Sequence, residues 1–210
     1  MTTILVANSK GGCGKTTVAT HLAVAFAKAG HATALIDTDR QRAALAWGKR
    51  RNESCAPVTL IDWTKQAVPL QKSRFSRLII DVPAGIKRTN MAELVDLADH
   101  IVIPVSPSMF DETGTLRFLK RLEDLKPIRK SRKTVILVGN RVRRNTHAAA
   151  RLERFLASLG HNVPARIRDS QLYPDYAIGG GTVFDGNNRR TRAHRDDWLP
   201  LLTFIEDGAI

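Results

Sequence analysis

The stretch from residue 9 to residue 17 reads Ser9-Lys10-Gly11-Gly12-Cys13-Gly14-Lys15-Thr16-Thr17. It follows a short apolar run at residues 3–7 and opens a stretch with apolar residues at helical spacing, residues 16–29. Gly14, Lys15 and Thr16 match the end of the phosphate-loop pattern G-x-x-x-x-G-K-[ST], although Ser9 stands in place of the first glycine. We therefore predict a loop between a buried strand and a helix that holds the phosphates of a nucleotide.

The residue types of this loop suit a triphosphate with its metal ion. Glycines let backbone N–H groups turn towards phosphate oxygens, and the N-terminus of the following helix adds partial positive charge. We expect Lys15 to reach the β- and γ-phosphates and the Thr16 hydroxyl to ligate Mg²⁺. The predicted nucleotide-binding residues of the loop are Gly11, Gly12, Cys13, Gly14, Lys15, Thr16 and Thr17.

Apolar runs rich in Ile, Val and Leu alternate with helical patterns along the 210 residues. The runs predict strands at 3–7, 33–37, 58–61, 77–81, 100–104, 134–138 and 163–167. The patterns predict helices at 16–29, 43–51, 89–98, 112–125, 146–159 and 196–206. This alternation is typical of an α/β fold: one domain over residues 1–210 with a doubly wound, mostly parallel sheet and helices on both faces. Ligands of such sheets bind beyond the carboxyl ends of the strands.

Three aspartates stand where predicted strands end. Asp81 directly follows the apolar run Leu78-Ile79-Ile80, which is a Walker B pattern, and we expect it to hold Mg²⁺ through water. Asp37 and Asp39 lie two residues apart at the end of another strand, so strand alternation places both on one side. The sequence therefore predicts an acidic cluster beside the phosphate loop.

A second lysine, Lys10, gives the loop the form Lys-Gly-Gly-x-Gly-Lys-Thr-Thr. This form resembles the deviant Walker A motif of the ParA/MinD superfamily. The resemblance implies a P-loop NTPase of the SIMIBI type that uses ATP and Mg²⁺ and forms a homodimer when ATP binds. It also implies that Lys10 crosses the dimer interface and stabilises negative charge on the partner's transferring phosphoryl group. Lys10, Lys15 and Asp39 are thus the predicted catalytic residues.

The same resemblance implies roles for further positions. Asp39 orients or deprotonates the attacking water, and Asp37 supports the Mg²⁺ shell, although Arg40 replaces the proline that partition ATPases carry there. Asn140, at the end of a predicted strand, is the candidate for reading adenine. The segment 169–184 also looks like small ParA proteins of the plasmid ParF type. The implied activity is slow ATP hydrolysis, stimulated by a ParB-like or adaptor partner.

Positive charge is concentrated in one part of the chain. The formal net charge is +13, and residues 126–195 carry 16 basic against 4 acidic side chains. Such clustering favours an acidic polymer as a partner. The resemblance implies non-specific binding of nucleoid DNA through phosphate contacts. The candidate DNA-binding residues are Arg141, Arg143, Arg144, Arg166, Arg168, Arg189, Arg190 and Arg192.

Several other classes of protein fit the sequence less well. A membrane-bound MinD-like switch needs a basic amphipathic C-terminal helix, whereas residues 196–210 carry four acidic and no basic side chains. An iron–sulfur reductase needs two available cysteines, and Cys13 lies inside the loop. A small-molecule synthetase leaves the basic stretch unexplained, and a DNA-coating scaffold needs neither Lys10 nor Asp39.

The sequence also bears on the compartment and on the cargo. No run is long enough for a membrane span and no signal peptide precedes the loop, so we expect a cytoplasmic, nucleoid-associated protein without a membrane partner and with reduced thiols. The sequence leaves the cargo open between a plasmid, a chromosome region and a carboxysome-like organelle of the McdA branch.

Overall fold

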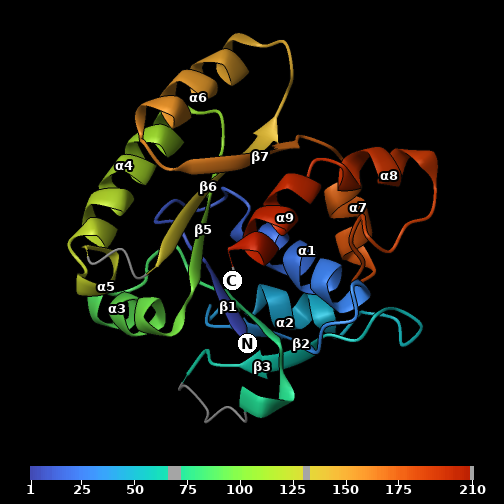
Figure 1. The fold of residues 1–210 in the computed structure, drawn as a ribbon. Coiled ribbons are helices and arrows are strands. Elements are labelled where there is room, and N and C mark those ends of the chain that lie inside the picture. Colours follow the sequence, from blue (N-terminus) through green and yellow to red (C-terminus); the bar gives the residue numbers. More distant parts are fainter. Residues whose placement is uncertain (66–71, 130–132, 209–210) are drawn as a thin grey trace.

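A single seven-stranded sheet forms the centre of the computed structural model, which describes residues 1–65, 72–129 and 133–208. All neighbouring strands are parallel, in the order β3-β2-β4-β1-β5-β6-β7 (Figure 1), so the sheet is wholly rather than mostly parallel. The doubly wound α/β prediction is confirmed. The strands are β1 (Thr2–Val6), β2 (Thr33–Asp37), β3 (Thr59–Asp62), β4 (Arg77–Asp81), β5 (His100–Val105), β6 (Thr134–Val142) and β7 (Asn162–Arg168).

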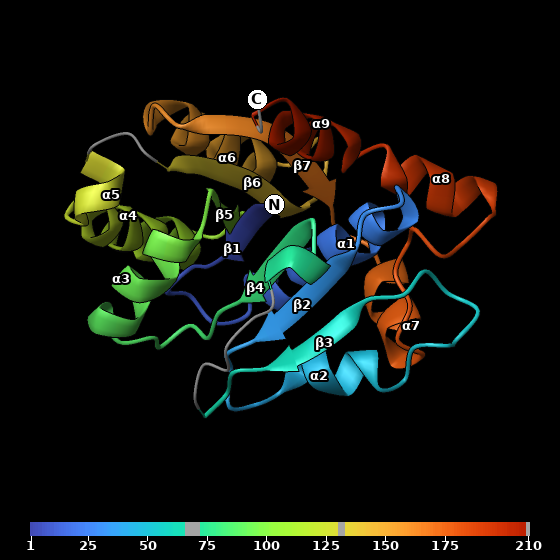
Figure 2. The same cartoon turned by 60° about the horizontal axis from the view of Figure 1, so that its bottom comes forward.

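Helices cover both faces of this sheet, as Figures 1 and 2 show. On one face lie α1 (Lys15–Lys28), α2 (Ala43–Gly48), α7 (Leu172–Ile178) and α9 (Leu199–Asp207), with α8 (Arg189–Arg195) at their edge. On the other lie α3 (Arg88–Leu97), α4 (Met109–Glu123), α5 (Lys126–Arg129) and α6 (His147–Ser158). A 3₁₀ turn, η1 (Lys72–Arg74), precedes β4.

Alternation within the central strand explains the two layers. Ile4 and Val6 of β1 pack into the core beneath α1, whereas Leu5 and the following Ala7 pack into the core beneath α3 and α4. All four side chains are fully buried. Because both faces of β1 are covered, its side chains are apolar without interruption from Ile4 onwards, as expected for a strand in the middle of a parallel sheet.

The register of the strands brings the predicted acidic cluster together. Asp37, the last residue of β2, is paired in register with Asp81, the last residue of β4, and Asp81 is also level with Val6 of β1. The loop from residue 9 to residue 14 follows β1 at this same edge. The carboxyl ends of three adjacent strands therefore present the phosphate loop and two carboxylates side by side.

The C-terminal helix belongs to the core. Trp198, Leu201 and Ile205 are fully buried, and the Trp198 ring stacks on His21 of α1 with 4.8 Å between ring centroids. Burial lowers the pKa of His21 to about 4, so the ring is neutral at pH 7 and its Nε2 accepts a hydrogen bond from the Val183 amide. Within the described part of the chain, no helix has the length and apolar content that crossing a membrane requires.

One buried ion pair ties the end of α2 to the segment after α7. The Arg51 guanidinium donates to both carboxylate oxygens of Asp185, at 3.0 Å each, and also to the Ala56 and Gly180 carbonyls. The side chains are 7% and 10% exposed. Removing one member leaves the other charge buried without its partner, which is costly.

We predict that Arg51→Ala lowers the free energy of unfolding by about 3–5 kcal/mol, because it leaves the Asp185 carboxylate buried without its ion-pair partner. Urea denaturation followed by circular dichroism measures this. Arg154→Ala, at an exposed position on α6, is the control and should change the value by less than about 0.5 kcal/mol. Equal stabilities of the two variants would contradict the assigned role of the pair.

Candidate nucleotide-binding site

The phosphate loop has a backbone conformation that requires glycine at two positions. Gly12 and Gly14 have φ angles of +79° and +93°, in the region that side chains disfavour. At Gly14 a Cβ atom would also lie 2.2 Å from the Asn140 side-chain nitrogen. The loop therefore turns back into α1 through two positions that favour glycine, and the binding of phosphates by its amides stays a prediction.

Two residues before the glycines fasten the loop to the neighbouring elements. The buried Asn8 donates from Nδ2 to the Pro104 carbonyl and to the Thr115 hydroxyl, at 3.0 Å each. Ser9 donates from its hydroxyl to the Gly114 carbonyl at 3.1 Å. These contacts were not predicted from the sequence, although a polar side chain directly after a buried apolar strand is a usable signal. They make α4 part of the site.

The Lys15 side chain lies over the loop. It is 9% exposed, and its Nζ donates to the Lys10 carbonyl at 2.9 Å. This hydrogen bond holds the ammonium group at the mouth of the loop, where a phosphate oxygen would compete for it. The role of Lys15 in binding the β- and γ-phosphates stays a prediction.

Thr16 and Asp81 face each other across the site. The Thr16 hydroxyl donates to Oδ2 of Asp81 at 2.7 Å. Asp81 is 2% exposed, and its Oδ1 has no hydrogen-bond partner within the described residues. Burial raises the pKa of Asp81 to about 7, the Thr16 hydrogen bond lowers it, and the nearby Asp37 charge raises it further. The ionised form of this buried carboxylate therefore lacks a compensating positive charge at Oδ1.

The donor set at this point fits Mg²⁺. A hydroxyl and a carboxylate are hard oxygen ligands, and no three acidic, histidine or cysteine side chains converge anywhere in residues 1–65, 72–129 and 133–208. Mg²⁺ suits such a sparse protein site because it keeps several waters and takes further ligands from the phosphates. When bound, it neutralises charge on the β- and γ-phosphate oxygens. Thr16 and Asp81 would hold it.

Asp37 has a structural task that the sequence did not indicate. Its Oδ1 accepts from the Asp39 amide at 2.9 Å, and its Oδ2 accepts from the Leu45 amide, in the first turn of α2, at 3.1 Å. Burial raises the pKa of Asp37, while these amides lower it. Asp37 thus fixes the turn that carries the half-buried Asp39. Its support of the Mg²⁺ shell stays a prediction.

Asn140 lies beneath the loop. Its Nδ2 donates to the Cys13 carbonyl at 2.7 Å, and the side chain is 4% exposed. Cys13 is also buried, and burial raises the pKa of its thiol, so the sulfur packs rather than reacts. The structure therefore gives Asn140 the task of holding the loop, and the adenine contact remains a prediction.

The candidate DNA-binding arginines divide into two groups. Arg166 pairs with Glu153 at 2.7 Å, and Arg168 binds Asp197 through two nitrogens while also donating to the Ala193 carbonyl. These two side chains are partly buried and hold β7 to α6 and to the segment after α8. Arg166 and Arg168 therefore stabilise the fold through ion pairs, which the sequence did not predict.

The remaining candidates reach the surface. Arg143 and Arg144 are exposed and lie near Asp169 and Asp197, at 2.6 Å and 3.6 Å. Four further side chains are exposed and make no ion pair with any described residue: Arg141, Arg189, Arg190 and Arg192. The positive charge of these four arginines is not balanced by an ion pair with a described residue, so it is the charge that a phosphate backbone would contact.

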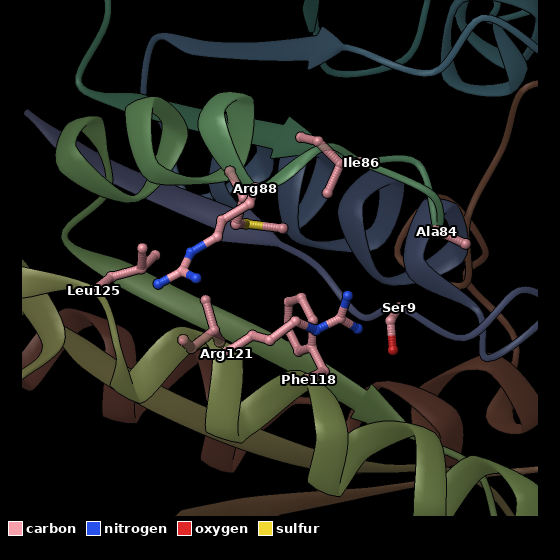
Figure 3. Close-up of a pocket in the computed structure, with 9 residues that line it drawn as sticks. Ser9, Ala84, Ile86, Arg88, Phe118, Arg121 and Leu125 are labelled. Carbon is pink, nitrogen blue, oxygen red and sulfur yellow. The ribbon is translucent and has the colours of Figure 1, made fainter.

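A small cavity lies on the α3–α4 side of the loop, next to Ser9 and Ala84 (Figure 3). Its volume is about 50 Å³, and its floor is apolar, with Phe118 of α4 shown among the lining residues. Arg88 and Arg121 extend over it from the two helices. Because ligand pockets measure ~300–1,000 Å³, this cavity cannot hold a nucleotide.

A strand, a glycine-containing phosphate loop and a helix carrying Lys15 and Thr16, faced by Asp81 from the adjacent strand, define a P-loop nucleotide-binding protein. Residues 4–180 match the family model described as the CobQ/CobB/MinD/ParA nucleotide binding domain. The chain belongs to this family and is a ParA/MinD-type P-loop NTPase, which confirms the resemblance seen in the loop.

Individual relatives agree with this assignment. The chain is 27% identical over 209 residues to the maintenance of carboxysome distribution protein A of Halothiobacillus neapolitanus, covering 97% of this chain and 95% of that one. It is 32% identical over 114 residues to the protein of the same name from Gloeobacter kilaueensis, covering 51% and 50%.

Solved structures share the fold. A MinC:MinD cell division complex of Aquifex aeolicus matches with a TM-score of 0.78 and 20% identity, over 97% of this chain and 96% of that one. The ATP complex of a Cyanothece McdA variant matches with a TM-score of 0.75 and 16% identity, over 100% and 96%.

We predict that Asp81 makes the stability of the nucleotide-free protein depend on pH. An unfolded aspartate titrates near 3.8 and folded Asp81 near 7, so the folded chain holds the extra proton between these values and loses stability as pH rises through them. Relative to Asp81→Asn, which cannot ionise, the wild type should lose roughly 3 kcal/mol between pH 5 and pH 8.

Urea titrations in EDTA at both pH values measure this difference. Asp62→Asn, at an exposed carboxylate, is the control and should keep the wild-type loss on passing from pH 5 to pH 8, because Asp81 is intact. A wild-type curve that runs parallel to that of Asp81→Asn across this range would show that Asp81 does not carry the proton.

Proposed function

We propose that residues 1–210 form one ATPase domain that dimerises on ATP, binds nucleoid DNA without sequence preference and positions a carboxysome-like cargo. The observation that carries the proposal is the loop itself: Lys15 contacts the Lys10 carbonyl, and Thr16 contacts the buried Asp81 on the adjacent strand. Similarity to a carboxysome distribution protein over 97% of the chain supports this cargo over a plasmid or a chromosome region. A ParB-like or adaptor protein would stimulate hydrolysis and so release the dimer from DNA.

In this proposal, each residue of the site has a distinct role in ATP hydrolysis. Loop amides and Lys15 bind the phosphates, and Asp39 holds the attacking water in line, which is the main help that phosphoryl transfer needs. Lys10 of one copy adds its ammonium group to the phosphates held by the other copy and lowers the cost of the charge that develops there. Hydrolysis is slow until the dimer and its partner protein bring these groups together.

The backbone and the Cβ of Lys10 have neighbours that support the proposed crossing. Its carbonyl is occupied by Lys15, and its Cβ lies against α4, 3.7 Å from where a Cβ at Gly114 would be. The side chain thus starts between the loop and a neighbouring helix. This placement supports a reach towards a second copy.

DNA binding rests on the exposed basic residues. Arg189, Arg190 and Arg192 lie together on α8, and Arg141 lies near the end of β6. Arginine binds phosphate oxygens with two nitrogens and keeps its charge at any cellular pH. This chemistry supports contact with the backbone of DNA and a cytoplasmic, nucleoid-associated location.

We predict a Mg²⁺-dependent ATPase in which single substitutions separate nucleotide binding, dimerisation and hydrolysis. Lys15→Ala should abolish nucleotide binding, because it removes the ammonium group that meets the phosphates. Asp39→Ala should bind ATP, dimerise and fail to turn over, because only the positioning of water is removed. A fluorescent ATP analogue, phosphate release and sedimentation velocity measure the three steps. An Asp39→Ala protein that stays monomeric with ATP would refute the assigned role.

We predict that replacing Arg189, Arg190 and Arg192 with alanine weakens DNA binding while ATP binding is unchanged. The slope of log affinity against log salt should fall by about 0.9 for each phosphate that the variant no longer neutralises. Fluorescence anisotropy on two unrelated duplexes measures affinity and sequence dependence. The control removes three exposed charges elsewhere, at Lys49, Arg50 and Arg74. Equal slopes for both triple variants would exclude α8 as a DNA-binding helix.

A further inference from the structure

The cavity between α3 and α4 combines an apolar floor with a basic mouth. Its floor consists of apolar side chains from both helices and from the segments beside them: Ile86, Met91, Phe118, Leu122 and Leu125. In Figure 3 the Arg121 side chain extends towards Ser9 and the Arg88 side chain towards Leu125. An apolar group that entered the cavity would therefore have a guanidinium group on each side.

The two arginines are available to a binding partner. Arg88 is exposed, and the ion pair that it forms with the exposed Asp124 is 3.9 Å long, so this pair contributes little. Nε of Arg121 donates to the Arg117 carbonyl at 3.3 Å, and Arg121 forms no ion pair within residues 1–65, 72–129 and 133–208. A carboxylate from another molecule would therefore displace no strong internal ion pair.

The size of the cavity limits what can enter it. Its volume is about 50 Å³, whereas one water-sized group occupies ~10–15 Å³. The cavity thus has room for the few carbon atoms of one branched aliphatic side chain and none for an acyl chain. Phe118 and Leu122 are already buried in the core, so the floor is formed before anything binds.

The chemistry of the cavity favours an acidic protein segment over DNA. A phosphate backbone would satisfy the arginines but carries no apolar group for the floor, and α8, where we propose DNA binding, lies with the opposite helical layer (Figure 1). Residues 84–91 carry two basic and no acidic side chains, which disfavours a basic segment. The fitting occupant is an aliphatic side chain with carboxylates on both sides of it in the chain.

We propose that this cavity binds an acidic segment of another protein, with one aliphatic side chain against Met91 and Phe118 and flanking carboxylates on Arg88 and Arg121. Arginine pairs with carboxylates through two parallel hydrogen bonds. An apolar anchor in a pocket, surrounded by polar contacts, is the usual centre of a protein interface. The inference goes beyond the proposed function and requires neither ATP nor DNA nor a dimer.

Two labelled peptides of equal charge test the proposal with the nucleotide-free protein. One contains Glu-Glu-Leu-Glu-Glu and the other Glu-Glu-Ser-Glu-Glu, so general attraction to a chain of net charge +13 is the same for both. Fluorescence anisotropy should give the leucine peptide about tenfold higher affinity, because only leucine buries apolar surface in the cavity. Equal affinities would show that the cavity takes no side chain and would overturn the proposal.

Three variants locate the binding. Arg121→Glu should weaken binding of the leucine peptide about tenfold, because it removes a charged hydrogen-bond donor. Lys120→Glu is the matched control, since Lys120 is the exposed neighbour outside the cavity lining, and it should weaken binding less than about twofold. Ile86→Trp should fill the cavity and abolish the preference for leucine over serine. Circular dichroism checks the fold, and the two exposed α4 positions keep the test decisive if Ile86→Trp unfolds.

The same measurements distinguish the other occupants. Equal weakening by Lys120→Glu and Arg121→Glu would reduce the binding to general charge attraction and overturn the proposal. In a nuclear magnetic resonance titration, the leucine peptide should shift the amide signals of Ile86 and Phe118. A short DNA duplex that shifts these two signals to the same extent would assign the arginines to DNA, which would also overturn the proposal.

Discussion

Asp81 and Asp37 end adjacent strands in register, and both carboxylates are buried. Placing two like charges side by side away from water raises the free energy of the ionised site, and one Asp81 oxygen has no partner in the described structure. Positive charge at the mouth of the phosphate loop relieves this repulsion. Lys15 supplies part of it, and Mg²⁺ with a triphosphate would supply the rest. The fold thus makes loading of the site favourable.

The phosphate loop is also rigidly connected to the helices that surround it. Asn8 and Ser9 fix it to α4, Asn140 fixes it to β6, and Asp37 fixes the turn that bears Asp39 to α2. The contacts to α4 are made at Gly114 and Thr115, in the second turn of that helix. In our proposal this connection couples ATP binding to dimerisation and, through the dimer, to DNA binding.

Local patterns in the sequence were sufficient to predict the strands of the sheet and the phosphate loop. All seven strands and the loop lie within a few residues of the predicted positions, because buried parallel strands are continuously apolar and the loop has a specific spacing. The helices α7 and α8 were not predicted, since seven residues give too little periodicity. Helix α2 ends at Gly48 rather than at residue 51, and β6 extends to Val142.

Side-chain partners across the sheet could not be predicted from sequence. The capping of α2 by Asp37, the Asn140 bond to the loop and the pairing of Arg168 with Asp197 join segments that are distant or follow irregular turns. Charge counting identified a basic stretch, but it could not separate arginines that hold the fold from those that remain at the surface. That distinction depends on which acidic side chains the strand order brings near.

The crossing of Lys10 between two copies is the central claim, and mixing two inactive variants tests it most directly. Lys10→Ala lacks the crossing ammonium group, and Asp39→Ala lacks the residue that positions water. If the lysine acts on the partner's nucleotide, one site of each mixed dimer is complete, and an equimolar mixture should recover up to about a quarter of the wild-type ATPase rate, since half of randomly paired dimers are mixed. If the mixture stays as inactive as either variant alone, Lys10 acts within its own subunit and the central claim is wrong.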